Sequence, residues 1–332
     1  MEHMDIKMLE TKNLLEWYFK SFSKRDDSTY NVNEDVAKTT FLINVAGNMK
    51  SFTCLEIEAS ASIFIEKLFS YYVDSDTFVI ACIEHPTIEK CLSTINNKFI
   101  ITSETIKNLD VNTIITAYKN SGCKKIFGYL TSTLNYQIIP QTFYTKLKEK
   151  LSEIDIPHTL VLDDVQTMFM IPKNYDSFDH VIFSMHALVQ GMNKGVLLSK
   201  ENLSFGHEDL FILKVFTEHL HTILENKDRL LLFNTMLTQY FSEELVYTAL
   251  FDTPKNTLPY NFYLIVKDNK AKKVLDKYKD ELYKYGIEIG DRGVTIRSAS
   301  TIMHYGAGWV IEGLDKLKSA LQKGIQIYNR VI

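Results

Sequence analysis

Polar residues able to bind or activate a ligand gather in three short stretches of this sequence, each next to a run of strand-forming residues. His85 lies in the first stretch, Asp163 and Gln166 in the second, and Ser184 and His186 in the third. An imidazole can transfer protons near neutral pH, a carboxylate stabilises a neighbouring positive charge, and hydroxyl and amide groups hydrogen-bond to polar ligands. The three stretches together predict a binding site for a small molecule.

A run of short strands must position these residues. The predicted strands are Phe78–Ile83, Phe99–Thr102, Ile126–Leu130, Thr159–Leu162, Val181–Ser184 and Val196–Ser199. Helical patterns at Val111–Asn120 and Gln141–Ile154 separate several of them. Alternating strands and helices predict right-handed βαβ units, and therefore an α/β domain with a mostly parallel sheet. The carboxyl ends of its parallel strands meet at one edge, where open α/β sheets bind their ligands.

Helical spacing of apolar residues also predicts helices at residues 9–22, at 56–72 and from Glu208 to about Leu250. Two prolines in Asp252–Pro259 interrupt the last of these. A βαββα tail is predicted beyond them, with elements at Phe262–Val266, Ala271–Tyr285, Ile287–Ile289, Val294–Arg297 and Trp309–Tyr328. We predict a large α/β domain (36–230), a small α+β domain (231–332) and an N-terminal helical segment (1–35) that packs on the small domain.

The composition limits the possible partners. The chain has 37 Lys and Arg against 41 Asp and Glu, a net charge of −4, so there is no electrostatic reason to expect a nucleic-acid partner. Its cysteines, which lack CxxC spacing and predict neither a disulfide framework nor a metal site, are Cys54, Cys82, Cys91 and Cys123. No apolar run approaches the length of a membrane-spanning helix. We expect a soluble, cytoplasmic protein.

In order and separation, the three stretches resemble segments of the fold-type I enzymes of pyridoxal 5′-phosphate (PLP), and within them the class V aminotransferase and cysteine desulfurase group. Ile80–Leu92, which reads IACIEHPTIEKCL, resembles the segment that places a histidine over the cofactor ring. The resemblance implies this role for His85. It also implies the α/β fold of PLP-dependent transferases, with a mixed, mostly parallel sheet in the large domain.

Leu162–Met168 reads LDDVQTM and resembles the segment in which an aspartate is followed three positions later by glutamine. The resemblance implies that Asp163 faces the pyridinium nitrogen and Gln166 the phenolic oxygen of PLP. Asp164 is the alternative if the alignment shifts by one residue. An ionised carboxylate favours the protonated ring nitrogen, which PLP needs in order to act as an electron sink.

Phe183–Gly195 reads FSMHALVQGMNKG and resembles the Ser-x-His-Lys segment of the same enzymes. The resemblance implies that Ser184 and His186 lie near the cofactor phosphate. The spacing of Gly191 and Gly195 also resembles the glycine-containing loop of glycine hydroxymethyltransferases.

Ala187 stands at the position where the resemblance implies the Schiff-base lysine. Alanine has no nucleophile, so transimination and the proton transfers of that lysine would be lost. Three explanations remain open: a Lys→Ala variant, a natural relative that uses another base such as His186 or Lys194, and a non-catalytic relative. The polar residues that stay together around this position favour the first two explanations.

The stretch expected to hold the phosphate departs from the family pattern. Phe52–Ser60 reads FTCLEIEAS and lacks the glycine of a phosphate-binding turn. Thr53 could contribute a hydroxyl group and a turn from Cys54 to Ile57 its backbone amides. Glu56 would repel a phosphate at that place.

Gly286–Arg297, which reads GIEIGDRGVTIR, resembles the part of the small domain where an arginine binds the substrate carboxylate. Arg297 matches that position and Arg292 is the alternative. A bidentate guanidinium suits a carboxylate better than the point charge of lysine does.

The resemblance implies a PLP-dependent transferase or lyase that acts on the amine or Cα of an amino acid or amino-acid-like substrate. Transamination, decarboxylation and aldol-type cleavage remain open, and a homodimer is expected. Desulfuration is disfavoured, because it needs a catalytic cysteine in the small domain and no cysteine follows Cys123. The alternative is a non-catalytic binding protein with the same fold. Singly, His85 and Asp163 are also typical of helix caps and turns, so the order of the motifs carries the prediction.

Overall fold

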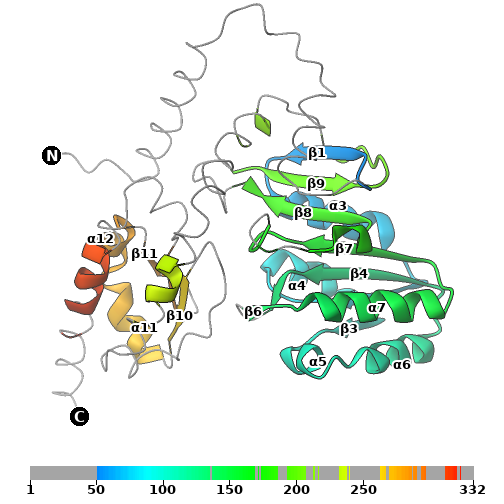
Figure 1. Ribbon diagram of the computed structural model, residues 1–332, viewed down its shortest axis with the longest axis horizontal. Coiled ribbons are helices and arrows are strands. Elements are labelled where there is room, and N and C mark those ends of the chain that lie inside the picture. The colour runs from blue at the N-terminus through cyan, green and yellow to red at the C-terminus, as the bar shows by residue number, and fades with distance from the viewer. Residues whose placement is uncertain are drawn as a thin grey trace, which may run out of the picture. The chain divides into compact units, whose positions relative to one another are not determined.

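The computed structural model describes residues 51–134, 137–168, 171, 173–185, 193–206, 212–213, 216, 232–237, 239, 262–266, 269–285, 287–289, 293–296, 311–319 and 322. They fall into two compact units. Residues 51–216 of this set form the sheet unit, and residues 232–322 form the C-terminal unit (Figure 1). The predicted N-terminal segment, with its helix at 9–22, lies outside the described residues. The predicted domain boundaries stay predictions.

A seven-stranded sheet with the order β1-β9-β8-β7-β4-β2-β3 forms the sheet unit. Its strands are β1 (Cys54–Glu58), β2 (Thr77–Ala81), β3 (Lys98–Ile100), β4 (Lys125–Thr131), β7 (His158–Asp163), β8 (His180–Ser184) and β9 (Gly195–Ser199). All pairings from β3 to β8 are parallel, whereas β9 runs antiparallel to both β8 and β1. The α/β fold with a mixed, mostly parallel sheet is therefore confirmed.

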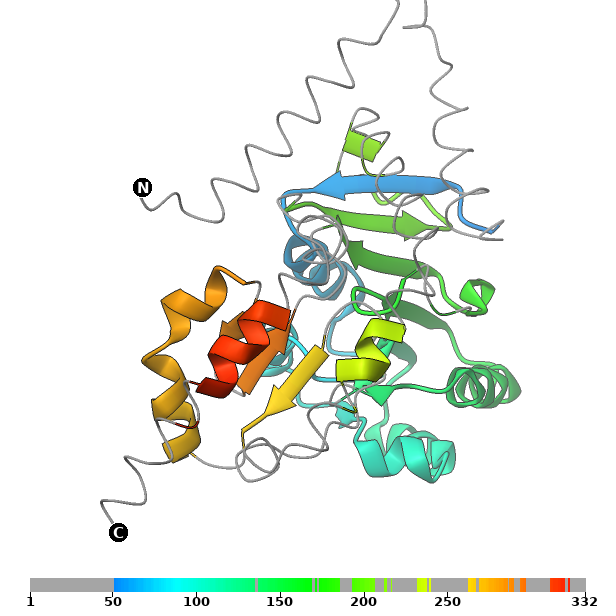
Figure 2. The same ribbon diagram turned by 60° about the vertical axis from the view of Figure 1, so that its left-hand side comes forward.

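Helices cover both faces of this sheet (Figure 2). They are α3 (Ala61–Tyr72), α4 (Pro86–Leu92), α5 (Ser103–Lys107), α6 (Val111–Ser121) and α7 (Gln141–Glu153). A short 3₁₀ helix spans Tyr175–Ser177, and a two-stranded ribbon joins β5 (Thr133–Leu134) to β6 (Gln137–Ile138). In β2, Val79 packs with the α3 side while the neighbouring Phe78 meets Tyr118 of α6, with ring centroids 5.7 Å apart. Successive strand residues therefore face opposite helical layers.

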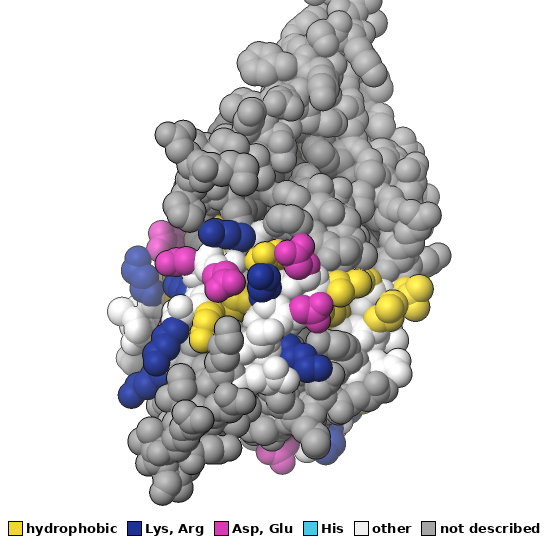
Figure 3. Space-filling view, turned by 90° about the vertical axis from the view of Figure 1, so that its left-hand side faces the viewer, with side chains coloured by type: hydrophobic (Ala, Val, Ile, Leu, Met, Phe, Trp, Pro, Cys, Tyr) yellow, Lys and Arg dark blue, Asp and Glu magenta, His cyan; other side chains and the backbone are white. Residues whose placement is uncertain are grey.

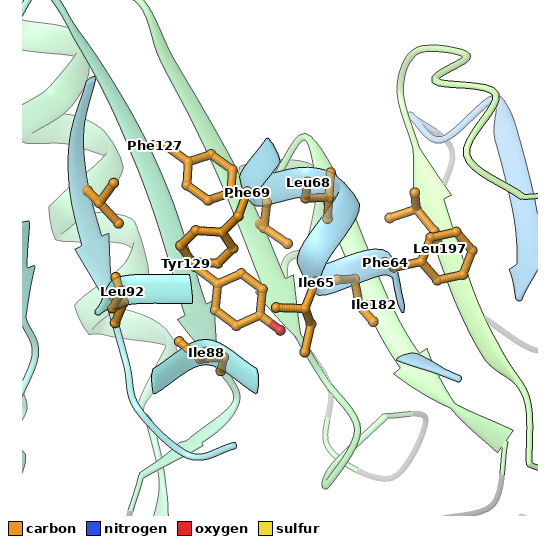
Figure 4. Close-up of a cluster of buried hydrophobic side chains, with 13 residues drawn as sticks. Phe64, Ile65, Leu68, Phe69, Ile88, Leu92, Phe127, Tyr129, Ile182 and Leu197 are labelled. Atoms are coloured by element: carbon orange, nitrogen blue, oxygen red, sulfur yellow. The ribbon is translucent and has the colours of Figure 1, made fainter. Parts of the chain in front are cut away.

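The core between α3, α4 and the sheet is rich in aromatic side chains (Figure 4). Phe69 of α3 lies edge-on to Phe127 at 5.2 Å and tilted against Tyr129 at 5.6 Å. Both partner rings belong to β4 and are fully buried. Because every residue of β2 is also buried, the central strands read as apolar runs in the sequence.

One sequence prediction near the site was wrong. Residues 56–72 do not form one helix, and Cys54 to Ile57 do not form a turn, because Cys54–Glu58 is the edge strand β1. Leu55 and Ile57 alternate with more polar residues and are buried, and the strand pairs with β9. The helix α3 begins only at Ala61.

The C-terminal unit has a three-stranded antiparallel sheet with the order β10-β12-β11. Its elements are β10 (Phe262–Ile265), α11 (Asn269–Asp276), α12 (Lys279–Tyr283), β11 (Ile287–Ile289) and β12 (Gly293–Ile296), with a helical segment at 311–319. The predicted helix Ala271–Tyr285 is divided in two, since Tyr278 N–H bonds to Leu275 O and closes a tight turn. On the face drawn in Figure 3, basic and acidic side chains of the described residues both occur.

Among the residues that the structure describes, no helix combines the length and the hydropathy needed to cross a lipid bilayer.

Candidate functional site

A cavity of about 310 Å³ opens at the carboxyl ends of β2, β4, β7 and β8 and at the beginning of α3. His85, Asp163, Gln166 and Ser184 all contribute to its wall. These four residues were predicted from separate stretches of the sequence, and the sheet brings them together because parallel strands end at a common edge.

The Asp163 carboxylate is held from two directions at the end of β7. Tyr129 donates its hydroxyl to Oδ2 at 2.8 Å, and the backbone N–H of Val165 donates to Oδ1 at 3.2 Å. Burial raises the pKa of Asp163, while the hydrogen bond from Tyr129 acts in the opposite direction. The carboxylate is therefore fixed in orientation at the wall of the cavity.

Asp164, the alternative from the sequence, has a different environment. Its carboxylate is fully buried and pairs with Lys173 Nζ at 2.7 and 3.0 Å, and it accepts from Tyr175 Oη and Thr167 Oγ1 at 2.6 Å each. Burial lowers the pKa of Lys173, and the carboxylate of Asp164 opposes that effect. Asp164 does not contribute to the cavity wall, so the geometry favours Asp163 as the residue that meets a ligand.

His85 follows β2 and caps helix α4. The backbone N–H of Thr87 donates to its Nδ1 at 3.2 Å, and Pro86 begins the helix. Since Nδ1 accepts a hydrogen bond, the neutral ring carries its proton on Nε2. The cap fixes one edge of the imidazole and leaves the ring at the cavity.

The beginning of α3 forms another part of the wall, with Ser60, Ala61 and Ser62. Ser60 is the N-cap residue, and its side chain makes no hydrogen bond to the helix. The first N–H groups of a helix have no acceptor within it, and they attract anions. This helix end was not predicted as part of the site, because the helix was expected to begin at residue 56, whereas α3 begins at Ala61. In the sequence, Ser60 and Ser62 stand just before the apolar positions of α3, and this pattern could have indicated where the helix begins.

Gly195 allows this helix end to approach the sheet. A Cβ atom at Gly195 would lie 2.3 Å from the backbone nitrogen of Ala61 and 2.4 Å from the carbonyl carbon of Ser60. Gly195 also pairs with Ser184 across β8 and β9. The absence of a side chain here therefore brings Ser184 and the N-terminus of α3 to the same cavity.

Replacement of Gly195 by alanine is expected to destabilise the sheet unit by about 1–3 kcal/mol, because the new methyl group would displace backbone atoms. Urea unfolding followed by circular dichroism measures this change. Gly128→Ala is the matched control, since its Cβ would meet the movable end of the Leu160 side chain instead. If Gly195→Ala lowers the free energy of unfolding no more than Gly128→Ala does, the close approach of Gly195 to the start of α3 is contradicted.

Residues 131–133 at the end of β4 add three more hydroxyl groups to the wall. Ser132 is 1% exposed, and its Oγ has no hydrogen-bond partner among the residues that the structure describes. A buried hydroxyl without a partner costs free energy, so such an atom facing a cavity is suited to a polar ligand. Ser132 could not be predicted from the sequence, because the burial of a single serine does not follow from the local pattern of residues.

No family model matches this chain, and no curated protein matches its sequence. Solved structures do match. A NifS-like protein from Rickettsia africae superposes with a TM-score of 0.63 at 14% identity, covering 92% of this chain and 96% of its own. An acetylornithine aminotransferase from Elizabethkingia anophelis gives 0.59 at 12% identity, with 97% and 86% covered. A PLP-bound C-S lyase from Staphylococcus hominis gives 0.57 at 12% identity, with 94% and 88% covered.

The chain has the fold of the fold-type I PLP enzymes. The predicted fold class is thereby confirmed, and the cavity lies at the edge of the fold-type I sheet where four predicted residues meet. At these identities the similarity establishes the fold, and the chemistry has to be argued from the residues themselves.

Other predicted residues of the fold-type I site lie elsewhere or are not described. Thr53 precedes β1, so it lies at the opposite end of that strand from the cavity, and its hydroxyl donates to Lys200 O at 3.1 Å. Glu56 does not line the cavity, and its carboxylate accepts from Gly206 N–H. The predicted residues outside the described part of the chain are His186, Ala187, Gly191, Arg292 and Arg297.

Proposed function

We propose that this chain binds PLP in the cavity beside Asp163 and acts on the amine or Cα of an amino acid or amino-acid-like substrate. The observation that carries the proposal is the convergence of His85, Asp163, Gln166 and Ser184 on one cavity. One of the similar structures, the C-S lyase from Staphylococcus hominis, is PLP-bound and supports the same class of ligand. Transamination, decarboxylation and aldol-type cleavage are the candidate reactions.

The residues around the cavity fit PLP. The cofactor presents a ring nitrogen, a phenolic oxygen and a phosphate, and each needs a different kind of partner. Asp163 suits the ring nitrogen, the unpartnered Ser132 hydroxyl suits a polar ring substituent, and the start of α3 suits the phosphate. When bound, PLP supplies an electron sink that stabilises negative charge at the substrate Cα.

Each of the polar residues at the cavity has its own task in this proposal. Asp163 holds a proton on the ring nitrogen by staying ionised beside it. His85 covers one face of the ring, and Gln166 hydrogen-bonds to the phenolic oxygen. Ser184 and Ser60 hydrogen-bond to the phosphate together with the first N–H groups of α3. The hydroxyl groups and helix amides then replace the glycine-containing turn that the sequence lacks.

The substrate side of the proposal rests on residues outside the described part of the chain. Arg297, with Arg292 as the alternative, would bind a substrate carboxylate through a bidentate pair. Ala187 leaves covalent attachment of the cofactor open. If alanine is the natural residue, the proton would have to be moved by His186 or by Lys194, which is a described residue and accepts a hydrogen bond from Ser184 Oγ at its backbone carbonyl, at 3.3 Å. We also propose a homodimer in the cytoplasm.

A non-catalytic PLP-fold binding protein is the second candidate function. The observation that favours it is Ala187, because alanine can neither attach the cofactor nor transfer a proton. A protein that keeps the cavity but does not turn over a substrate would fit this alternative.

Absorbance titration with PLP tests the proposal. We expect saturable binding to the wild-type chain, and a covalent bond to the cofactor in Ala187→Lys that borohydride reduces and mass spectrometry locates at position 187. Asp163→Asn should weaken binding at least roughly tenfold, because it removes a charged hydrogen-bond acceptor. Thr53→Ala is the matched control and should bind normally. Wild-type protein that does not bind PLP would refute the proposal.

Turnover separates the two candidate functions. If the Ala187→Lys protein consumes an amino acid while the chain with Ala187 only binds the cofactor, the chain is a Lys→Ala variant of an enzyme. Wild-type turnover that is lost in His186→Gln or Lys194→Met identifies a natural relative with another base. PLP binding without turnover in either form favours the non-catalytic protein.

A further inference from the structure

Tyr129 lies behind the cavity wall, and its hydroxyl contacts the wall residue Asp163. Its side chain is fully buried in the cluster between α3, α4 and the sheet, where its ring packs against Phe69 (Figure 4). Its hydroxyl donates to Asp163 Oδ2 at 2.8 Å. The two residues come from neighbouring strands, since β4 and β7 pair in parallel.

Both oxygens of the carboxylate are therefore held by the protein. Val165 N–H donates to Oδ1 from the turn after β7, and Tyr129 donates to Oδ2 from the next strand. Two donors from different elements prevent rotation of the carboxylate about its Cβ–Cγ bond. The lone pairs that remain can then face a ligand in the cavity.

We propose that Tyr129 is a positioning residue that fixes the Asp163 carboxylate in the orientation and charge state needed to bind a protonated ring nitrogen. The ligand in this statement rests on the proposed function. The hydrogen bond itself, and its effect on the carboxylate, belong to the protein without ligand.

The electrostatic environment of Asp163 explains why such a donor is needed. Burial raises the pKa of its carboxyl group, and the nearby Asp164 raises it further. The hydrogen bonds from Tyr129 and Val165 N–H lower it, and a positive charge on His85 would act in the same direction. Burial and Asp163 together raise the pKa of Tyr129, so its hydroxyl stays protonated and remains a donor.

The other titratable groups nearby do not take over this role. Glu84 lines the same cavity and, when ionised, opposes a negative charge at Asp163. Cys82 of the adjacent chain segment is buried, which raises its pKa to about 11, so it is neutral at physiological pH. Asp164 is paired with Lys173. The hydroxyl of Tyr129 therefore opposes the effect of burial directly at the carboxylate.

Titration of the protein without ligand tests the inference by ¹³C NMR of its labelled aspartate carboxyl groups. In Tyr129→Phe, which keeps the ring, we expect Asp163 to take up its proton at a higher pH than in the wild type. Tyr118→Phe is the matched control, because it removes the hydroxyl of another tyrosine with a buried ring, which donates to Cys123 O away from the cavity. An unchanged Asp163 titration in Tyr129→Phe would overturn the inference.

A double-mutant cycle tests the link to the ligand, with PLP as the probe. Tyr129→Phe should weaken PLP binding roughly tenfold in the wild-type background and have no further effect in the Asp163→Asn background. Equal losses in both backgrounds would mean that Tyr129 does not act through Asp163. If the wild-type chain does not bind PLP, the proposed function fails, whereas the titration still decides the role of Tyr129.

A measurement on the wild-type chain covers the case in which Tyr129→Phe does not fold. The ¹³Cζ resonance of labelled Tyr129, assigned by its change in Asp163→Asn, should move at the pH where Asp163 takes up its proton. A resonance that stays constant through that titration would overturn the inference.

Discussion

Replacement of Lys173 by methionine is expected to lower the free energy of unfolding of the sheet unit by about 3–5 kcal/mol. Lys173 is 3% exposed at its side chain, and its partner Asp164 is fully buried. Removal of the ammonium group would leave the Asp164 carboxylate uncompensated in the interior. Tyr175 and Thr167 would still donate to it, but neither carries a charge.

Lys124→Met is the matched control for this change. Lys124 also pairs with an aspartate at 2.7 Å, Asp76, but its side chain is 79% exposed. Exposed ion pairs contribute about 0–1 kcal/mol, because water screens both charges. Chemical denaturation should therefore show a large loss of unfolding free energy in Lys173→Met and a small one in Lys124→Met. Similar losses in the two variants would contradict the buried ion pair.

The double variant Asp164→Leu/Lys173→Met adds a second comparison. A buried pair replaced by apolar residues of similar volume often regains much of the lost stability. We expect the double variant to be more stable than Lys173→Met alone. Asp164 immediately follows Asp163, so a disturbed turn in Lys173→Met would also weaken PLP binding. The loss of PLP affinity should be smaller in the double variant.

The sequence could predict the central sheet because its strands are buried on both faces. Phe78–Ile83 and Val181–Ser184 are apolar runs flanked by polar residues, and β2 and β8 form there with shifts of one or two residues at their ends. Parallel strands ending at one edge then placed His85, Asp163 and Ser184 together. For these residues, local pattern and global topology agree.

The edge strand β1 could not be predicted in the same way. Its apolar residues Leu55 and Ile57 precede those of α3 without a break, so the local pattern suggests a longer helix. The antiparallel pairing with β9 decides the structure, and this partner is far away along the chain. For this reason Thr53 was predicted to bind the cofactor phosphate, whereas the helix end that attracts anions begins near Ser60.

The choice between two adjacent aspartates also needed the structure. Asp163 and Asp164 have the same chemistry, and the sequence does not show that Lys173 and Tyr175 turn inward to meet one of them. Burial of these polar partners is a tertiary effect. The same holds for Tyr129, which reads as an ordinary aromatic residue of a strand until its hydroxyl is seen at Asp163.

Acidification should destabilise the sheet unit through His180, which is fully buried at the beginning of β8. Its Nδ1 lies 2.9 Å from Ser199 Oγ and its Nε2 lies 2.7 Å from Tyr72 Oη. Ser199 donates its own proton to Glu201 O, so Nδ1 is the donor to Ser199, while the hydroxyl of Tyr72 donates to Glu201 Oε1 as well as lying beside Nε2. Burial of the ring favours its neutral form.

Burial lowers the pKa of His180 from 6.5 to about 4, although Asp179 and Glu201 oppose this effect. Above pH 6.5 the ring is neutral in the folded and the unfolded chain, so it contributes no pH dependence. Between pH 6.5 and about 4 the unfolded chain takes up a proton that the folded chain does not, and stability falls. Below that range both forms are protonated and the loss levels off, at about 3 kcal/mol in total.

Urea unfolding at a series of pH values measures this loss. His180→Gln should show a smaller decrease of unfolding free energy between pH 6.5 and 4, since glutamine does not titrate. His158→Gln is the matched control, because His158 is also in a strand of the sheet but is only partly buried. NMR of the wild-type imidazole gives an independent result, and a His180 ring that takes up its proton near pH 6.5 in the folded chain would contradict the prediction.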